Sequence, residues 1–338
     1  MSRKLTIKDA INEALRQEMD ADPRVLLFGE DIAGGAGRDE DYPDAADAWG
    51  GPFGVTKGLL PRFGRRRVVD TALAETGFIG ASIGAAIAGL RPVAEIMYID
   101  FIGTSFDQLL NQAAKLRYVY GGKVSVPIVV RTVAGAGFRA AAEHSQALYS
   151  LYTHVPGLKV VAPATADDAK GLLQSAIRDP NPVCYMEHKG LYRHVKGEVP
   201  DGEHTVQIGE ARVAREGEEM TVIAYGSSVA LALQAAEELD EDIEVLDLRT
   251  LYPLDTEAVL ATARKTGKVL VAHEATQSCG VGAEVTAVIS EHAFEDLDAP
   301  VRRLTTPDVP IPFSPPLEQR VLPQLDDMKE ACRGLLAY

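Results

Sequence analysis

Short apolar runs alternate with longer amphipathic segments along most of this chain, a pattern that predicts strands alternating with helices. In the first half the predicted elements are strands 25–29, 68–71, 91–96, 127–132, 160–162 and 183–187 and helices 7–20, 77–90, 106–120 and 165–179. In the second half they are strands 221–225, 243–248, 268–273 and 301–304 and helices 228–239, 256–266 and 282–292. Such alternation is typical of mostly parallel sheets with helices on both faces, so we predict an α/β fold.

A change in composition divides the chain into two parts. Residues 194–202 are polar and contain glycine and proline, as linkers between domains often do. We therefore predict a first domain at 1–193, a linker at 194–206 and a second α/β domain at 207–338. The proline-rich stretch 306–316 is unsuited to regular structure, and we expect it to wrap a surface or contact a partner.

Charge and composition exclude several classes of protein. The 338 residues carry a net charge of -15, from 34 basic and 49 acidic residues, whereas binding to nucleic acid or to an anionic membrane needs a basic face. No apolar run approaches the ~18 residues that cross a bilayer, and the first residues lack the apolar stretch of a signal peptide. The three cysteines lie far apart without a CxxC pair, which argues against disulfides or a zinc site. We expect a cytoplasmic protein with no nucleic-acid or membrane partner.

Glu75 is the first candidate for chemistry, because it stands between the predicted strand 68–71 and the predicted helix 77–90. The carboxyl end of a buried strand is where open α/β sheets bind ligands. Neighbours such as Leu73 and Phe78 are apolar, so we expect this carboxyl group to be poorly solvated and suited to acid–base chemistry. The alternative is a first-turn acid that interacts with the helix dipole.

His144 is the second candidate. It follows the glycine-rich loop 134–139, beyond the fourth predicted strand, and is therefore expected at the same sheet edge as Glu75. The alternative is a loop histidine bound to backbone. Of the other histidines, only His273, beside Glu274 at a strand end, forms a further pair of interest, and none has the tight spacing of a metal motif such as HExxH.

Several common catalytic and phosphate-binding motifs are missing. The chain contains no GxGxxG or Walker sequence, and its Gly226-Ser227-Ser228 segment after a predicted strand is not a GxSxG nucleophile motif, so it shows no phosphate cradle of its own. An acid–base crevice without such a cradle suggests that another chain completes the site. The segment 33–54, rich in glycine, aspartate and alanine, is long for a loop and is predicted to be either functional or disordered.

An ordered series of motifs over residues 5–325 resembles the β subunit of the thiamine diphosphate-dependent first component of 2-oxo acid dehydrogenase complexes. The matching motifs are Phe28-Gly29-Glu30-Asp31, Glu75-Thr76-Gly77-Phe78, Gly89-Leu90-Arg91-Pro92-Val93-Ala94-Glu95, Phe106-Asp107-Gln108, His144-Ser145-Gln146, Glu187-His188-Lys189 and Asp247-Leu248-Arg249-Thr250-Leu251-Tyr252-Pro253. The resemblance implies two parallel-sheet three-layer domains, a transketolase-like pyrimidine-binding domain followed by a transketolase C-terminal-like domain.

The resemblance also implies partners. In this family an α subunit completes an α2β2 assembly and holds magnesium and the diphosphate through a Gly-Asp-Gly motif, which this chain lacks. The second domain of the β subunit is implied to serve dimerisation and docking to the lipoyl acyltransferase core.

The same resemblance implies roles for individual residues. Glu75 would hydrogen-bond N1′ of the aminopyrimidine and drive tautomerisation of its 4′-amino group, while the cofactor carries the carbanion chemistry. Leu73 and Met97 match positions near the pyrimidine, Phe101 matches the ring that stacks on it, and the family often has glutamine where this chain has Met97. His144 matches a histidine that faces the reaction centre and takes part in transfer to lipoyl groups. A structural potassium site, made largely of backbone carbonyls, is implied at Ile128, Ala176, Ile177, Asp179 and Asn181.

Within this family, segments 47–51, 54–59 and 131–141 are most similar to acetoin dehydrogenase β chains. We therefore favour acetoin over pyruvate or a branched-chain 2-oxo acid as the donor, by analogy. A non-catalytic assembly subunit is one alternative, and the presence of Glu75 and His144 argues against it. A self-contained transketolase-like enzyme or a nucleotide-dependent dehydrogenase is another, and the missing Gly-Asp-Gly and GxGxxG motifs argue against both.

Overall fold

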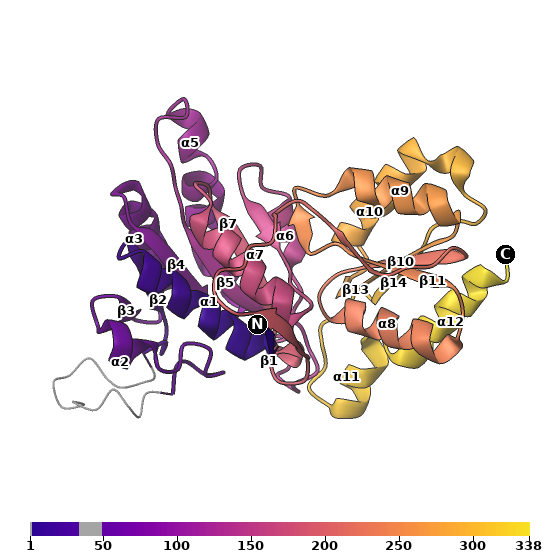
Figure 1. The fold of residues 1–338 in the computed structure, drawn as a ribbon, viewed down its shortest axis with the longest axis horizontal. Helices are drawn as coiled ribbons and strands as arrows, with labels where there is room; N and C mark the ends of the chain where they lie inside the picture. The colour runs from indigo at the N-terminus through magenta and orange to yellow at the C-terminus, as the bar shows by residue number, and fades with distance from the viewer. Residues whose placement is uncertain (1, 34–48) are drawn as a thin grey trace.

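The computed structural model describes residues 2–33 and 49–338. Most of the segment 33–54, including Asp47 and Ala48 of the acetoin-type motif, lies outside the described residues. An amino-terminal lobe, indigo to magenta in Figure 1, lies beside a carboxyl-terminal lobe coloured orange to yellow.

The first lobe is built on a seven-stranded sheet. In spatial order its strands are β12 (Thr250–Tyr252), β6 (Lys159–Val161), β7 (Val183–His188), β5 (Val129–Ala134), β4 (Arg91–Ile96), β2 (Val25–Gly29) and β3 (Val68–Asp70). Every neighbouring pair is parallel except β12 with β6. The mostly parallel sheet predicted for this part of the chain is therefore confirmed.

Helices cover both faces of this sheet. Successive side chains of each strand point to opposite sides, so the apolar strands have apolar side chains to bury on each face. Val93 and Val129 face α1 (Ile7–Ala21) and α7 (Ala166–Arg178), whereas Ala94 and Val130 face α3 (Glu75–Ile87) and α4 (Ile102–Asp107). The helix predicted at 106–120 is interrupted, since a π-helical segment (Gln108–Ala113) follows α4 and precedes α5 (Leu116–Val119). Short helices at α2 (Leu59–Phe63) and α6 (Tyr149–Thr153) complete the lobe.

The second lobe is a five-stranded sheet. Its strands, in spatial order, are β14 (Arg302–Thr306), β13 (Val269–Thr276), β10 (Met220–Ala224), β11 (Ile243–Asp247) and β9 (Arg212–Arg215), of which only β9 runs antiparallel to its neighbour. One face is covered by α9 (Thr256–Thr266) and α10 (Val281–His292), and the other by α8 (Ser227–Leu239) and α12 (Leu325–Leu336) (Figure 1). The sequence pattern predicted the parallel strands and the first three helices, and missed β9 and α12.

The two lobes are joined more closely than a flexible linker would allow. Within the predicted linker 194–206, β8 (Lys196–Pro200) pairs antiparallel with β1 (Ser2–Thr6). β12 belongs to the second half of the sequence but extends the first sheet, and one apolar core runs from α3 through the interface to α9 and α10. The domain limits at 193 and 207 stay a prediction. The prediction of no regular structure is wrong for the end of the stretch 306–316, because Pro315 and Pro316 open α11 (Pro315–Val321), where the first turn needs no amide donors. Glu318 of α11 contacts Gly137 of the first lobe.

A buried charge cluster lies on the α1 and α7 face of the central strands. Arg131 of β5 donates to Glu95 of β4 at 2.5 Å and to both oxygens of Glu187 of β7, at 2.6 and 2.8 Å. The Tyr192 hydroxyl also donates to Glu187, and all four side chains are buried. Burial alone would lower the Arg131 pKa, but the two carboxylates raise it above its ordinary value.

We expect Arg131→Met to lower the free energy of unfolding by about 3–5 kcal/mol, because it leaves two buried carboxylates without their cation. The matched control is Arg62→Met, which removes a more exposed ion pair with Asp20 at 2.8 Å and should cost less than about 1 kcal/mol. Urea unfolding of both variants measures the difference, and equal losses would contradict the assignment.

Candidate active site

The predicted site residues lie together at the carboxyl edge of the first sheet. β3, β4 and β5 are parallel and end at Asp70, Ile96 and Ala134, so the segments that follow them leave the sheet on the same side. The residues that follow these strand ends are Leu73 and Glu75, Met97 and Phe101, and His144.

The His144 ring is held by aromatic side chains. Its centroid lies 5.1 Å from that of Tyr98 and 5.4 Å from that of Phe101, and both contacts are edge-to-face, at 77° and 87°, a favourable arrangement for aromatic rings. The Lys189 ammonium donates to the His144 carbonyl and lies 5.2 Å from the Tyr98 ring. The structure therefore brings the predicted residues Phe101 and His144 into contact, and orients the imidazole by packing.

Glu75 is the first residue of α3 and is partly buried. The Thr76 hydroxyl donates to the Thr104 carbonyl, which ties the start of α3 to α4, the helix that directly follows Phe101. The expectation that apolar neighbours would enclose Glu75 is wrong on one side, because Leu73 is 83% exposed. Leu73 lies in the connection between β3 and α3, beyond the sheet edge, whereas Phe78 is buried because it faces the core from within α3.

Glu30 is a proton-binding group to which the sequence analysis gave no role. It follows β2, is 8% exposed, and its Oε1 atom has no hydrogen-bond partner among the described residues. Burial, together with the negative charges of Glu75, Asp31 and Glu95, raises the Glu30 pKa to about 7. The sequence feature that could have identified Glu30 is its position at the end of a strand, inside the motif Phe28-Gly29-Glu30-Asp31.

Two more charged side chains, the partly buried Asp100 and the buried Lys189, support the His144 segment and were missed. Asp100 accepts from the backbone and side-chain amides of Gln146 at 3.0 and 2.9 Å. Lys189 is 2% exposed, and burial lowers its pKa while Asp100, Glu274 and Glu318 oppose that shift. The position of Lys189 directly after β7, in the motif Glu187-His188-Lys189, was a signal that the sequence offered. The charges of the second lobe that act on Lys189 could not be inferred from the spacing of residues along the chain.

His273 and Glu274 have different roles. His273 packs inside the second lobe, whereas Glu274 connects the second lobe to the first. His273 is buried in the second lobe, stacked on Tyr225 at 5.4 Å, and burial lowers its pKa to about 4. Glu274 instead reaches the first lobe, where its Oε2 atom lies 2.7 Å from His188 Nε2.

The residues predicted to bind potassium gather at the opposite, amino-terminal edge of the sheet. Arg91 donates to the carbonyls of Ile177 and Asp179 at 2.7 and 3.4 Å, and Lys159 pairs with the Asp179 carboxylate. The Ile128 carbonyl accepts from a backbone amide of β7. Because Arg91 and Lys159 already bind oxygens of Ile177 and Asp179, these contacts fit a further cation poorly.

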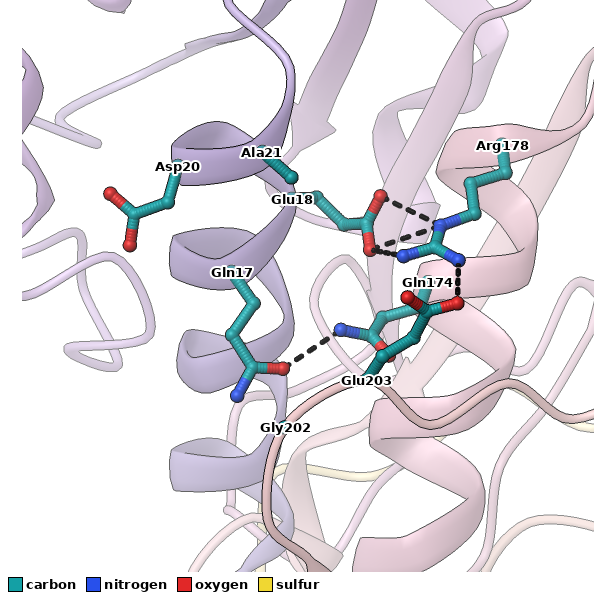
Figure 2. A pocket seen from close by; sticks show the side chains of 8 residues that line it. All are labelled: Gln17, Glu18, Asp20, Ala21, Gln174, Arg178, Gly202 and Glu203. Atoms are coloured by element: carbon teal, nitrogen blue, oxygen red, sulfur yellow. Dashed lines mark hydrogen bonds and ion pairs between the residues drawn. The ribbon is translucent and has the colours of Figure 1, made fainter.

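A pocket of about 360 Å³ opens at this same edge, between the carboxyl ends of α1 and α7 (Figure 2). Its polar groups bind one another, since Arg178 pairs with Glu18 and Glu203, and Gln17 accepts from Gln174 at 2.9 Å. The pocket is far along the strands from the predicted site residues, and we assign it no function.

In the part of the chain that the structure describes, no group of three or more His, Cys, Asp or Glu side chains is placed to hold a metal ion. Within the same residues no helix combines the length and the apolar character needed to span a membrane.

Comparison with known proteins defines the class. The family of the transketolase pyrimidine-binding domain matches residues 3–195, and that of the transketolase C-terminal domain matches residues 209–328. A solved structure described as a split-gene transketolase, inactive beta4 tetramer, has a TM-score of 0.76 and covers 98% of both chains, at 22% identity. The predicted order of two transketolase-type domains is therefore confirmed.

Relatives at higher identity narrow this class. Acetoin:2,6-dichlorophenolindophenol oxidoreductase subunit beta of Bacillus subtilis is 49% identical, over 99% of this chain and 98% of the relative. The 2-oxoisovalerate dehydrogenase subunit beta of the same organism is 46% identical, over 98% of each. Pyruvate dehydrogenase E1 component subunit beta of Rickettsia felis is 41% identical, over 99% of each. The chain belongs to this family of thiamine diphosphate-dependent dehydrogenase β subunits.

Glu30→Gln should change the pH dependence of stability. With a folded pKa of about 7 against an ordinary 4.5, the folded chain keeps a proton that the unfolded chain has released, so stability falls as pH rises through this range. The amide removes this cost, and we expect the variant to be more stable than wild type at pH 8, by about 1 kcal/mol or more, with the gap closing toward pH 5.

Urea unfolding at several pH values measures this difference. Glu330→Gln, at an exposed position of α12, is the control and should show no such pH-dependent gap. A gap for Glu30→Gln that stays constant from pH 5 to pH 8 would contradict the interpretation.

Proposed function

We propose that this chain is the β subunit of a dehydrogenase component that cleaves acetoin, or decarboxylates a 2-oxo acid, and passes the acyl unit to a lipoyl group. The observation that carries the proposal is the arrangement at the carboxyl edge of the first sheet. There Glu75 and Glu30, whose pKa is about 7, follow the neighbouring strands β3 and β2. His144, packed on Phe101, follows β5 on the other side of β4. The identities of 41–49% to named dehydrogenase β subunits support it.

The residues at this edge fit the aminopyrimidine of thiamine diphosphate. Glu75 offers a carboxyl group for N1′, and Phe101 offers a ring face for stacking. Leu73 is exposed and Met97 is buried, and both supply apolar contact without a hydrogen bond. When bound, the cofactor supplies the carbanion chemistry. Glu75 holds and returns the proton at N1′, and Glu30 keeps a second titratable proton beside it at neutral pH.

His144 is proposed to move a proton at the substrate oxygen. Tyr98 and Phe101 hold its ring edge-on, and Lys189 fixes its backbone carbonyl. Such packing leaves few rotamers to the imidazole, which is the preorganisation that general acid–base catalysis needs.

We propose an α subunit as the partner that completes this site in an α2β2 assembly. The exposed Leu73 beside Glu75 supports this, because a dry acid–base site needs a cover on that side. Magnesium and the diphosphate are assigned to the α subunit, and the lipoyl acyltransferase core to the second domain, as the resemblance implies. We assign potassium no role in the reaction, because Arg91 already binds the Ile177 carbonyl and Lys159 already binds the Asp179 carboxylate.

We propose acetoin as the donor. The relative named for acetoin is 49% identical, compared with 46% for the one named for 2-oxoisovalerate and 41% for the one named for pyruvate. This ordering agrees with the motifs that favoured acetoin.

Glu75→Gln should reduce turnover of the complex with its α subunit by about 100-fold or more, because the amide cannot exchange the proton at N1′. Unfolding free energy and assembly, measured by urea titration and sedimentation, should stay unchanged. Glu291→Gln, at an exposed position of α10, is the charge-matched control. Near-normal turnover of Glu75→Gln would exclude this mechanism.

The reconstituted complex should use acetoin with a kcat/KM at least about tenfold above that for pyruvate or 2-oxoisovalerate, a discrimination that one or two pocket contacts can supply. Lipoate-coupled assays on the three donors measure this. A preference for pyruvate would overturn the donor while leaving the β-subunit assignment in place.

A further inference from the structure

The segment 135–146, which we name the His144 loop, carries the proposed catalytic histidine in a strained backbone. The Gly135 amide donates to the Gln146 carbonyl at 2.9 Å and closes the loop at its base. Arg139 and Ala141 have φ angles of +57° and +61°, a left-handed conformation that is unfavourable for residues other than glycine. Such a backbone persists only where its surroundings hold it.

Two carboxylates of the second lobe supply that support. Glu274 of β13 accepts from the Ala136 amide at 2.5 Å, and Glu318 of α11 accepts from the amides of Gly137 and Arg139 at 3.0 and 3.2 Å. Glu318 is buried although α11 lies on the surface. Hydrogen bonds from backbone amides to a carboxylate are stronger than those between neutral groups.

Glu274 is itself fixed in place. The Gly190 amide donates to His188 Nδ1 at 3.2 Å, which orients the ring so that its Nε2 atom lies 2.7 Å from Glu274 Oε2. Ser227 donates to the same oxygen at 2.9 Å. Burial alone would raise the Glu274 pKa, but His188 and these donors hold it at about 2, so the group is a carboxylate at neutral pH.

The second lobe also acts on the far end of the loop. Lys189 donates to the His144 carbonyl. Burial lowers the Lys189 pKa, and the charge of Asp100 in the first lobe, followed by those of Glu274 and Glu318 in the second, favours its ammonium form. The same two acids thus contact the start of the loop and support the cation at its end.

We propose that Glu318, together with Glu274, is a positioning residue through which the second domain holds the His144 loop in its active conformation. The second domain then takes part in the chemistry as well as in assembly. This inference rests on the proposed role of His144.

The test uses Glu318→Ala, which removes the acceptor, and Glu318→Gln, which keeps the side-chain volume and carries the test if the alanine variant does not fold. Gln319→Ala, exposed on the same helix, is the control. In the full chain, hydrogen exchange of the Gly137 and Arg139 amides should be at least about tenfold faster in Glu318→Ala, since both amides donate to the Glu318 carboxylate. Lipoate-coupled turnover of the reconstituted complex should fall about tenfold, mainly in kcat, and about threefold for Glu318→Gln.

A double-mutant cycle with His144→Asn shows whether Glu318 acts through the histidine. In the His144→Asn background, Glu318→Ala should reduce turnover by less than about twofold. Full additivity, or unchanged exchange in the loop, would overturn the inference while leaving the role of His144 intact. If His144→Asn alone keeps normal turnover, the proposed function of His144 fails and this inference fails with it.

Discussion

The contact of one guanidinium with two carboxylates, at the centre of the first sheet, is the interaction on which the active-site edge depends. Arg131 joins β4 to β7 through Glu95 and Glu187, on the face covered by α1 and α7. Because a shift of one residue would turn these side chains to the opposite face, the cluster fixes the register of three adjacent strands. It thereby fixes where the segments after β4 and β5 leave the sheet.

The same cluster shapes the electrostatics of the site. Glu95 is one of the negative charges that raise the Glu30 pKa, so an interaction that orders the sheet also tunes an acid beside Glu75. A hydrophobic substitute of equal volume for such a cluster often preserves stability, but it would not supply this charge. We interpret the cluster as serving specificity and site chemistry together.

The sequence predicted the strand ends that the candidate residues follow, but it did not predict the contacts that hold these residues in place. β2 and β4 have the predicted bounds of 25–29 and 91–96, because buried parallel strands are continuous apolar runs between turn residues. Parallel strands in turn place Glu75 and His144 at one edge, although their roles stay predictions. Glu318 could not be predicted, because its contact with the His144 loop depends on tertiary structure. The interruption of helix 106–120 and the exposure of Leu73 were missed for the same reason, since neighbours in space decide both.

The strand that the second half of the chain adds to the first sheet has a consequence for solubility. Without Thr250–Tyr252, the side of β6 away from β7 would present free amides and carbonyls, a template on which another chain could extend the sheet. β12 covers that side and is itself only three residues long, followed by Pro253, which has no amide proton to donate. The molecule thus blocks intermolecular strand pairing at this margin with its own polypeptide.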